Sequence, residues 1–189
     1  MKRTMMLVLA VSVVGSFAAR ADAPPPPTAQ PSSVIETDPA YHLLDFWLGD
    51  WEVQTNDTHQ RDGHDTVERV LRGAAIVERW SDADGSEGRS WFYYQRAEKR
   101  WKQVWVTDGG AVKEKAMLAP LAGGAVRFRG RETRTDGRQV LDQTTLTPLE
   151  DGRVRQVIEV SRDGGATWKT VYDATYTHGA MDPKAHTRE

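Results

Sequence analysis

The sequence predicts an all-β protein: an antiparallel, up-and-down closed β-barrel of about ten strands, with a short N-terminal helix plugging one end. After residue 50 the chain consists of short segments in which apolar and polar residues alternate. Pairs of residues that tight hairpins favour separate these segments. The pairs are Asp62-Gly63, Asp84-Gly85, Gly109-Gly110, Gly123-Gly124, Asp136-Gly137, Asp151-Gly152 and Gly164-Gly165.

No helical pattern lies between these segments, so neighbouring strands are expected to pair antiparallel. Closure into a barrel would remove the unpaired edges of so wide a sheet. Two alternatives remain, an eight-stranded lipocalin-like barrel and a two-sheet sandwich. The strands are expected near 51–56, 64–72, 74–81, 89–96, 101–108, 112–118, 125–133, 139–148, 153–161 and 168–178.

The segment before the first strand predicts a short helix over residues 39–47. Asp38 is suited to cap it, and Pro39 suits its first position. Gly49 is expected to end the helix through a positive φ, because glycine adopts that conformation at little cost. From Trp51 onward the apolar period changes to two. Gly49 and Trp51 are therefore the expected structural residues of the barrel floor.

The string Phe46-Trp47-Leu48-Gly49-Asp50-Trp51-Glu52 resembles the motif of an uncharacterised family of secreted bacterial proteins. Its Gly-x-Trp element is similar to the one that opens lipocalin barrels. The resemblance covers about residues 38–178 and implies a calycin-like barrel, distantly similar to lipocalins, fatty-acid-binding proteins and haem-binding nitrobindins. It implies a fold and assigns no activity.

Four regions are expected along the chain. Residues 1–21 have the charged start, apolar core and small-residue cleavage site of a signal peptide, with cleavage after Ala21. Residues 22–37 are rich in proline and are expected to form a disordered leader. The barrel domain spans 38–178, and 179–189 form a flexible tail. This organisation predicts a periplasmic or secreted protein without membrane insertion after cleavage.

Charge and cysteine content exclude several functions. The full chain has 25 basic and 27 acidic residues; without Lys2, Arg3 and Arg20 the counts are 22 and 27, a net charge of −5. This balance gives no electrostatic basis for binding nucleic acid. The sequence has no cysteine, which excludes disulfides and thiolate metal ligands.

The segment 161–168 fits the Ser-x-Asp-x-Gly-x-Thr-Trp pattern of the Asp-box hairpin. In this interpretation the Asp163 carboxylate accepts backbone N–H groups and Trp168 covers the turn. The segment is therefore expected to be structural.

Alternating positions on four strands supply the candidate ligand site. On most strands the face with larger aromatic and fewer charged side chains is taken as inward; for 89–96 the sequence does not separate the two faces. An apolar pocket with a few polar groups is typical of small-molecule sites. The alternative is a filled core in which Glu78 meets an interior arginine. The predicted ligand-binding residues are Glu78, Trp80, Phe92, Tyr94, Gln103, Trp105 and Gln156.

No cofactor and no metal site is predicted. The histidines form no metal-binding motif, and no nucleophile elbow, phosphate loop or dinucleotide fingerprint occurs. Haem is an alternative ligand, with His178 at the end of the last strand as its axial ligand.

The leading hypothesis is a binding protein for a small, partly apolar or amphipathic molecule held inside the barrel. The first alternative is an enzyme in the same cavity, either an isomerase or hydrolase that uses Glu78 as acid or base, or a haem-dependent enzyme that uses His178. The second is a ligand-free envelope-accessory or interaction protein.

Overall fold

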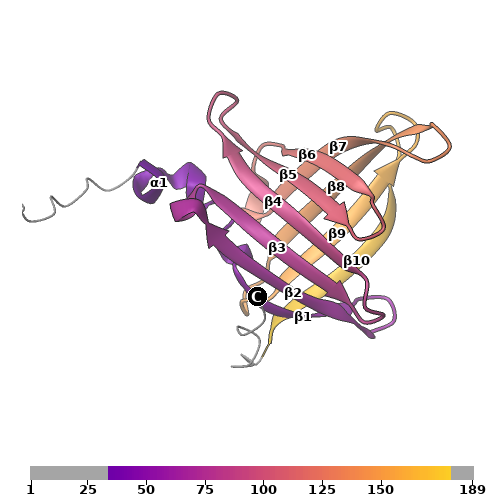
Figure 1. Cartoon of the computed structure of the whole chain (residues 1–189), viewed down its shortest axis with the longest axis horizontal. Coiled ribbons are helices and arrows are strands. Elements are labelled where there is room, and N and C mark those ends of the chain that lie inside the picture. The colour runs from indigo at the N-terminus through magenta and orange to yellow at the C-terminus, as the bar shows by residue number, and fades with distance from the viewer. Residues whose placement is uncertain (1–33, 180–189) are drawn as a thin grey trace, which may run out of the picture. The chain divides into compact units, whose positions relative to one another are not determined.

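Ten antiparallel strands form a closed barrel in which each strand pairs with its neighbours in sequence and β1 pairs with β10 (Figure 1). The structure is a computed structural model and describes residues 34–179. The strands are β1 (Gly49–Thr55), β2 (Arg61–Val70), β3 (Ala75–Asp82), β4 (Glu87–Gln95), β5 (Arg100–Thr107), β6 (Val112–Met117), β7 (Val126–Thr133), β8 (Gln139–Pro148), β9 (Val154–Ser161) and β10 (Lys169–His178).

The prediction of a closed ten-stranded antiparallel barrel is confirmed, and each strand lies within a few residues of its expected place. The barrel closes where Trp51 of β1 pairs with His178 of β10, and this pairing continues to Thr55 and Ala174. The predicted signal peptide, the leader up to residue 33 and the tail from residue 180 lie outside the described residues.

Six of the seven predicted turn pairs lie between strands, as expected. The seventh, Asp62-Gly63, does not. The hairpin between β1 and β2 uses residues 56–60, and Gly63 lies inside β2 opposite Asp82 of β3. The physical reason is close packing: a Cβ atom on Gly63 would lie 2.4 Å from the carbonyl oxygen of Ser81. Here glycine permits a close approach within a strand.

Short helical turns precede the barrel. The end of the expected leader forms α1 (Val34–Thr37), and two 3-10 turns follow, η1 (Pro39–His42) and η2 (Asp45–Trp47). Asp38 caps η1 as predicted, because its Oδ1 accepts the N–H of Ala40 at 2.9 Å. Two further 3-10 turns connect strands, η3 (Leu71–Gly73) and η4 (Ala122–Gly124). Among the described residues no helix has the length and apolar character needed to cross a bilayer.

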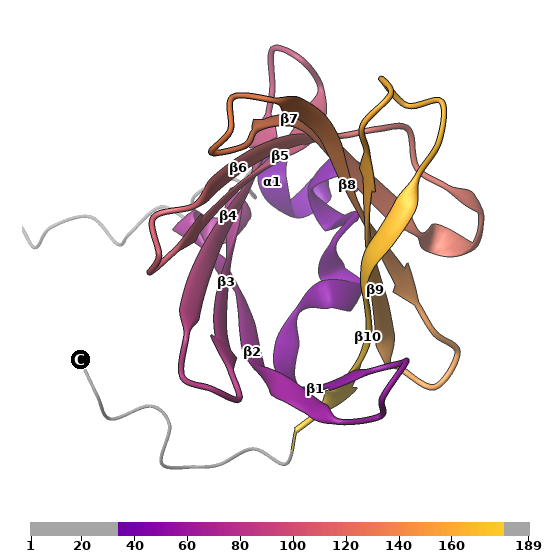
Figure 2. The ribbon, with the colours of Figure 1, turned by 90° about the vertical axis from the view of Figure 1, so that its right-hand side faces the viewer.

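Residues 38–48, called the 38–48 segment below, lie within the ring of strands at one end (Figure 2). Hydrogen bonds attach the segment to β1, β5 and β2. The indole N–H of Trp51 donates to the Trp47 carbonyl at 3.1 Å, that of Trp101 donates to the Ala40 carbonyl at 2.7 Å, and Arg69 donates to the Tyr41 carbonyl at 3.0 Å. We call this the near end, and the opposite end, where β1 finishes at Thr55, the far end.

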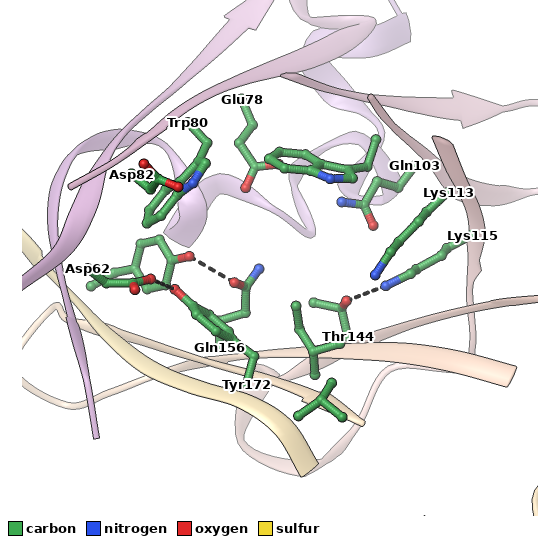
Figure 3. Close-up of a pocket in the computed structure, with 14 residues that line it drawn as sticks. Asp62, Glu78, Trp80, Asp82, Gln103, Lys113, Lys115, Thr144, Gln156 and Tyr172 are labelled. Atoms are coloured by element: carbon green, nitrogen blue, oxygen red, sulfur yellow. Dashed lines mark hydrogen bonds between the residues drawn. The ribbon is translucent and has the colours of Figure 1, made fainter. Parts of the chain in front are cut away.

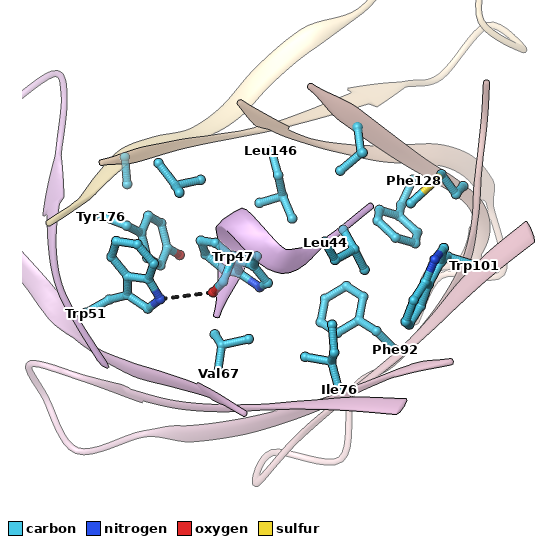
Figure 4. Close-up of a cluster of buried hydrophobic side chains, with 14 of the residues drawn as sticks. Leu44, Trp47, Trp51, Val67, Ile76, Phe92, Trp101, Phe128, Leu146 and Tyr176 are labelled. Atoms are coloured by element: carbon cyan, nitrogen blue, oxygen red, sulfur yellow. Dashed lines mark hydrogen bonds between the residues drawn. The ribbon is translucent and has the colours of Figure 1, made fainter. Parts of the chain in front are cut away.

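The hydrophobic core fills the near half of the barrel (Figure 4). Leu44 and Trp47 of the 38–48 segment are fully buried among inward side chains of the strands. Trp51 stacks on Trp47 with ring centroids 5.9 Å apart. Burying aromatic side chains of this size gives a large hydrophobic stabilisation, and stacking adds to it. The core side chains from the strands include Trp51, Val67, Ile76, Phe92, Trp101, Phe128, Leu146 and Tyr176.

The hairpin between β9 and β10 has the predicted Asp-box geometry. Asp163 Oδ1 accepts the Thr167 N–H at 2.9 Å and the Ser161 hydroxyl at 2.7 Å. These donors hold the pKa of Asp163 well below its usual range. Trp168 covers the turn, and its indole N–H donates to the Gly165 carbonyl at 3.2 Å. The structural interpretation of this segment is therefore confirmed.

Candidate functional site

A cavity of about 370 Å³ occupies the barrel interior between the hydrophobic core and the far end (Figure 3). Small-molecule pockets have volumes in this range, roughly 300 Å³ and above. The lining mixes aromatic, aliphatic, acidic, basic and amide side chains from seven of the ten strands. The lining residues are Asp62, Glu78, Trp80, Asp82, Gln103, Trp105, Lys113, Lys115, Thr144, Gln156, Ile158, Val171, Tyr172 and Tyr176.

The structure brings five of the seven predicted ligand-binding residues together in this cavity: Glu78, Trp80, Gln103, Trp105 and Gln156. The other two, Phe92 and Tyr94, lie in the near half. Phe92 is inside the hydrophobic core, and Tyr94 packs against Tyr41 of the 38–48 segment with ring centroids 4.8 Å apart. Phe92 and Tyr94 therefore lie on the inner face of β4, which the sequence alone did not distinguish from the outer face, but the 38–48 segment covers both side chains.

Two strand glycines provide the space for the indole rings of the cavity. A Cβ atom on Gly88 of β4 would lie 2.2 Å from ring carbons of Trp105, and one on Gly63 of β2 would lie 2.7 Å from Trp80. Real Cβ atoms do not approach a ring so closely, so any larger residue would displace the indole. Each tryptophan therefore lies against the sheet in a space that only glycine leaves open.

Two buried carboxyl groups, called the carboxyl pair below, lie on β2 and β3. Asp65 and Glu78 are 0% and 4% exposed. They are diagonal neighbours, because Glu78 pairs with Val67, two residues from Asp65. Burial raises the pKa of Glu78 to about 7, although Ser90, Asp65 and Lys115 act in the opposite direction. Burial and the charge of Glu78 raise the pKa of Asp65 well above its usual range. The raised pKa of Asp65 favours its protonated form, which donates to Glu78.

A polar row continues from the carboxyl pair across β4 and β5. Ser90 lies directly opposite Glu78 in the β3–β4 pairing and hydrogen-bonds to it. The Gln103 side-chain N–H donates to the Ser90 hydroxyl oxygen at 3.1 Å. The Gln103 side-chain oxygen, Oε1, is buried and has no hydrogen-bond partner among residues 34–179. The row therefore presents an unpaired acceptor beside a carboxyl group that takes up a proton near neutral pH.

Two lysines line the cavity from β6. Lys113 Nζ lies 2.8 Å from Asp142 Oδ2 and 3.9 Å from a Glu132 oxygen. Lys115 forms an ion pair with the other Asp142 oxygen and donates to the Thr144 hydroxyl at 2.6 Å. Burial alone would raise the pKa of Asp142, but the two ammonium groups hold it below its usual value. Each lysine therefore already has an anionic partner.

Tyrosine and amide groups complete the wall on β9 and β10. The Tyr176 hydroxyl donates to Gln156 Oε1 at 2.8 Å, which leaves the Gln156 side-chain N–H group facing the cavity. Nearer the far end, the Tyr172 hydroxyl donates to an Asp62 oxygen at 2.6 Å. Burial raises the pKa of both tyrosines, so they remain neutral hydrogen-bond donors.

His178, the axial ligand in the haem alternative, does not line this cavity. It ends β10 at the near end, is exposed, and stacks on Trp51 with ring centroids 4.0 Å apart. A Cβ atom on Gly49 would lie 3.0 Å from the His178 ring, so these residues and Trp51 form one close contact. Within residues 34–179, no three histidine or acidic side chains lie close enough together to hold a metal ion.

Sequence reasoning missed the charged groups on β2 and β6. The alternation on β6 separates Lys113 and Lys115 from Val112 and Ala116, and the apolar pair suggests the wrong inward face. In the structure Val112 is 53% exposed, while Lys115 is 6% exposed. Asp65 was missed for the same reason: it is a charged residue type at an inward position, where alternation predicts an apolar side chain. One signal was present: Asp142 lies on a strand of otherwise neutral residues, so its carboxylate needs a cationic partner.

The chain matches no protein-family model. A search of curated proteins finds no significant match.

Proposed function

We propose that this protein is a periplasmic or secreted binding protein, with a calycin-like barrel that holds a small, partly apolar ligand. The observation that carries the proposal is the cavity of about 370 Å³, whose wall combines two indole rings with convergent polar groups. Residues 1–21 would direct export, and the 38–48 segment would close the near end of the barrel. The ligand would enter at the far end.

The wall of the cavity supports binding of a ligand in preference to a filled core. A filled core would pair its buried polar groups internally, because an unpaired buried group costs roughly 1–3 kcal/mol. Gln103 is 6% exposed and keeps an unpaired oxygen, and the Gln156 N–H group faces the cavity. A bound molecule would satisfy both groups while its apolar part contacts Trp80 and Trp105.

Binding can be tested with a pair of matched variants on β9. Ile158→Phe would fill the cavity, because Ile158 lines it, whereas Val157→Phe places the same ring on the opposite face of the strand. N-phenyl-1-naphthylamine, a neutral fluorescent reporter, should bind the wild type and the Val157 variant with similar affinity. It should bind the Ile158 variant at least tenfold more weakly. Equal binding by all three proteins would contradict the proposal. So would no binding by any protein when native mass spectrometry also finds no co-purified molecule.

Export has a separate test. When the full chain is produced in bacteria, the intact mass of protein from the periplasm should correspond to a chain that begins at Asp22. Uncleaved protein retained in the cytoplasm would contradict the proposed compartment.

A second candidate, an isomerase or hydrolase, is favoured by one observation. Glu78 lines the cavity and has a pKa of about 7, which is suitable for a general acid or base at neutral pH. In this case Glu78→Gln should abolish turnover of a substrate while leaving its binding nearly intact. Unchanged turnover in the variant would exclude Glu78 as the acid or base.

A further inference from the structure

The charges of the cavity wall do not balance. Three acidic side chains line the cavity, Asp62, Glu78 and Asp82. The two lysines that line it offset this charge only in part, because both form ion pairs with the buried Asp142, although Lys115 also lowers the pKa of Glu78. Figure 3 shows the lysines on one side of the cavity, and Glu78 and Asp82 toward the other. Among residues 34–179, no cationic side chain forms an ion pair with Asp62, Glu78 or Asp82, so the acidic side can accept a positive charge.

The cavity wall also holds a buried oxygen that lacks a hydrogen-bond donor. Gln103 donates its own N–H to Ser90 and is left with an unpaired, buried oxygen. Glu78 is also buried; it accepts from Ser90 and Asp65, and no cationic side chain among residues 34–179 hydrogen-bonds to it. One shared proton serves the contact within the carboxyl pair. It leaves the Gln103 oxygen, and the Glu78 charge at neutral pH, for a group that the ligand would bring.

Aromatic rings flank this acidic side. Trp80 precedes Asp82 on the inner face of β3, and Trp105 lies opposite Ser90 in the β4–β5 pairing. An organic cation is attracted to the face of an indole ring, and tryptophan gives the strongest such interaction. The acceptors, the charge and the rings thus all favour one ligand chemistry.

We propose that the cavity binds a small organic cation, a protonated amine on a flat apolar body, with the ammonium group between Glu78 and Gln103 and the body against Trp80 and Trp105. This inference rests on the proposed binding function and specifies its ligand class. Asp62 and Asp82, nearer the far end, would attract the cation toward the cavity.

Binding should depend on pH, because the charge of Glu78 does. The titratable groups around Glu78 are Asp65 on β2, Lys115 on β6 and Tyr176 on β10. The tyrosine stays neutral. Burial lowers the pKa of Lys115, but the ion pair with Asp142 opposes this shift, so we expect Glu78 to be the group that changes charge near neutral pH. As the pH falls through about 7, Glu78 takes up a proton and the ammonium group loses its counter-charge. The cation should then bind more weakly.

The test compares three probes that share one phenyl ring and differ in charge: 2-phenylethylamine, 2-phenylethanol and 3-phenylpropionate. Isothermal titration calorimetry on the full mature chain at pH 8 should show the amine binding at least tenfold more tightly than the other two. Binding of the amine should weaken at least tenfold between pH 8 and pH 5.5, and the alcohol should show no such change. Glu78→Gln should remove the preference for the amine, while Glu114→Gln, on the exposed face of β6, should retain it.

The comparison on the wild type decides the inference even if the Glu78 variant does not fold. An alcohol or acid that binds as tightly as the amine would overturn the cationic ligand, and so would a preference for the amine that survives in folded Glu78→Gln. In both cases the neutral reporter would still bind, so the proposed binding function would stand. If neither the amine nor the reporter binds, both proposals fail.

Discussion

Replacing Glu78 by glutamine tests the electrostatics of the cavity through stability alone, without a ligand. Glu78 is 4% exposed and its pKa rises to about 7 from an ordinary value of 4.5, with burial as the main cause. Between these two values the folded protein holds a proton that the unfolded chain has released. The free energy of unfolding therefore falls as the pH rises across this window. Above the window the loss remains, but the titration of Glu78 adds no further change with pH.

The magnitude follows from the width of the window. Each pH unit contributes about 1.4 kcal/mol, so the window from 4.5 to 7 corresponds to about 3 kcal/mol lost from the wild type. Glutamine has nearly the same shape and no titrating proton. Relative to the wild type, Glu78→Gln should therefore gain about 3 kcal/mol of stability between pH 4.5 and pH 7, and nothing more above pH 7.

Urea unfolding followed by tryptophan fluorescence at pH values from 4.5 to 8.5 measures this difference. Glu114→Gln is the matched control, because Glu114 is exposed and its curve should run parallel to that of the wild type. Parallel curves for the wild type and Glu78→Gln would refute the reasoning, since they would show that Glu78 titrates in the folded protein as it does in the unfolded chain.

Three further predictions concern the packing that shapes the cavity, each measured by urea unfolding. Gly88→Ala should lose about 1–3 kcal/mol of stability, because its Cβ would overlap the Trp105 ring; an unchanged unfolding midpoint would show that Trp105 does not need the space left by Gly88. Leu44→Ala should lose about 2–5 kcal/mol, because Leu44 is fully buried in the core; a loss below about 1 kcal/mol would show that the 38–48 segment does not pack there. Asp142→Asn should lose about 3–5 kcal/mol, because the nearly buried Lys115 ammonium would lose its counter-charge; wild-type stability would contradict this ion pair.

The number and order of strands could be predicted from sequence because an up-and-down barrel depends on local signals. Alternation identifies each strand, and residues such as Gly110 and Gly137, which adopt positive φ in the structure, mark the turns between strands. The rule failed at Asp62-Gly63 because the same residue type serves two purposes. Gly63 supplies space for Trp80 inside a strand, and only the pairing of distant residues reveals this requirement.

The inward side chains of the site could be predicted from sequence, but their height along the barrel could not. Both results follow from what apolar and polar alternation along a strand reveals. It identifies which side chains point inward, and it placed Glu78, Gln103 and Gln156 correctly on the inner face. It does not give the height of a residue along the barrel. Phe92 and Tyr94 share the inner face but lie in the half that the 38–48 segment fills.

The division of the barrel into a filled half and a hollow half follows from strand number. A barrel of about eight strands has an interior that side chains can just fill, and the diameter grows with each added strand. Ten strands therefore enclose more space than their own side chains occupy. Leu44 and Trp47 take up this surplus at the near end, where the lining is apolar. Toward the far end the inward residues include Glu78, Lys113 and Lys115. An apolar segment placed over them would bury charged groups without water or a partner, which is costly. The extra space at that end therefore remains as the cavity.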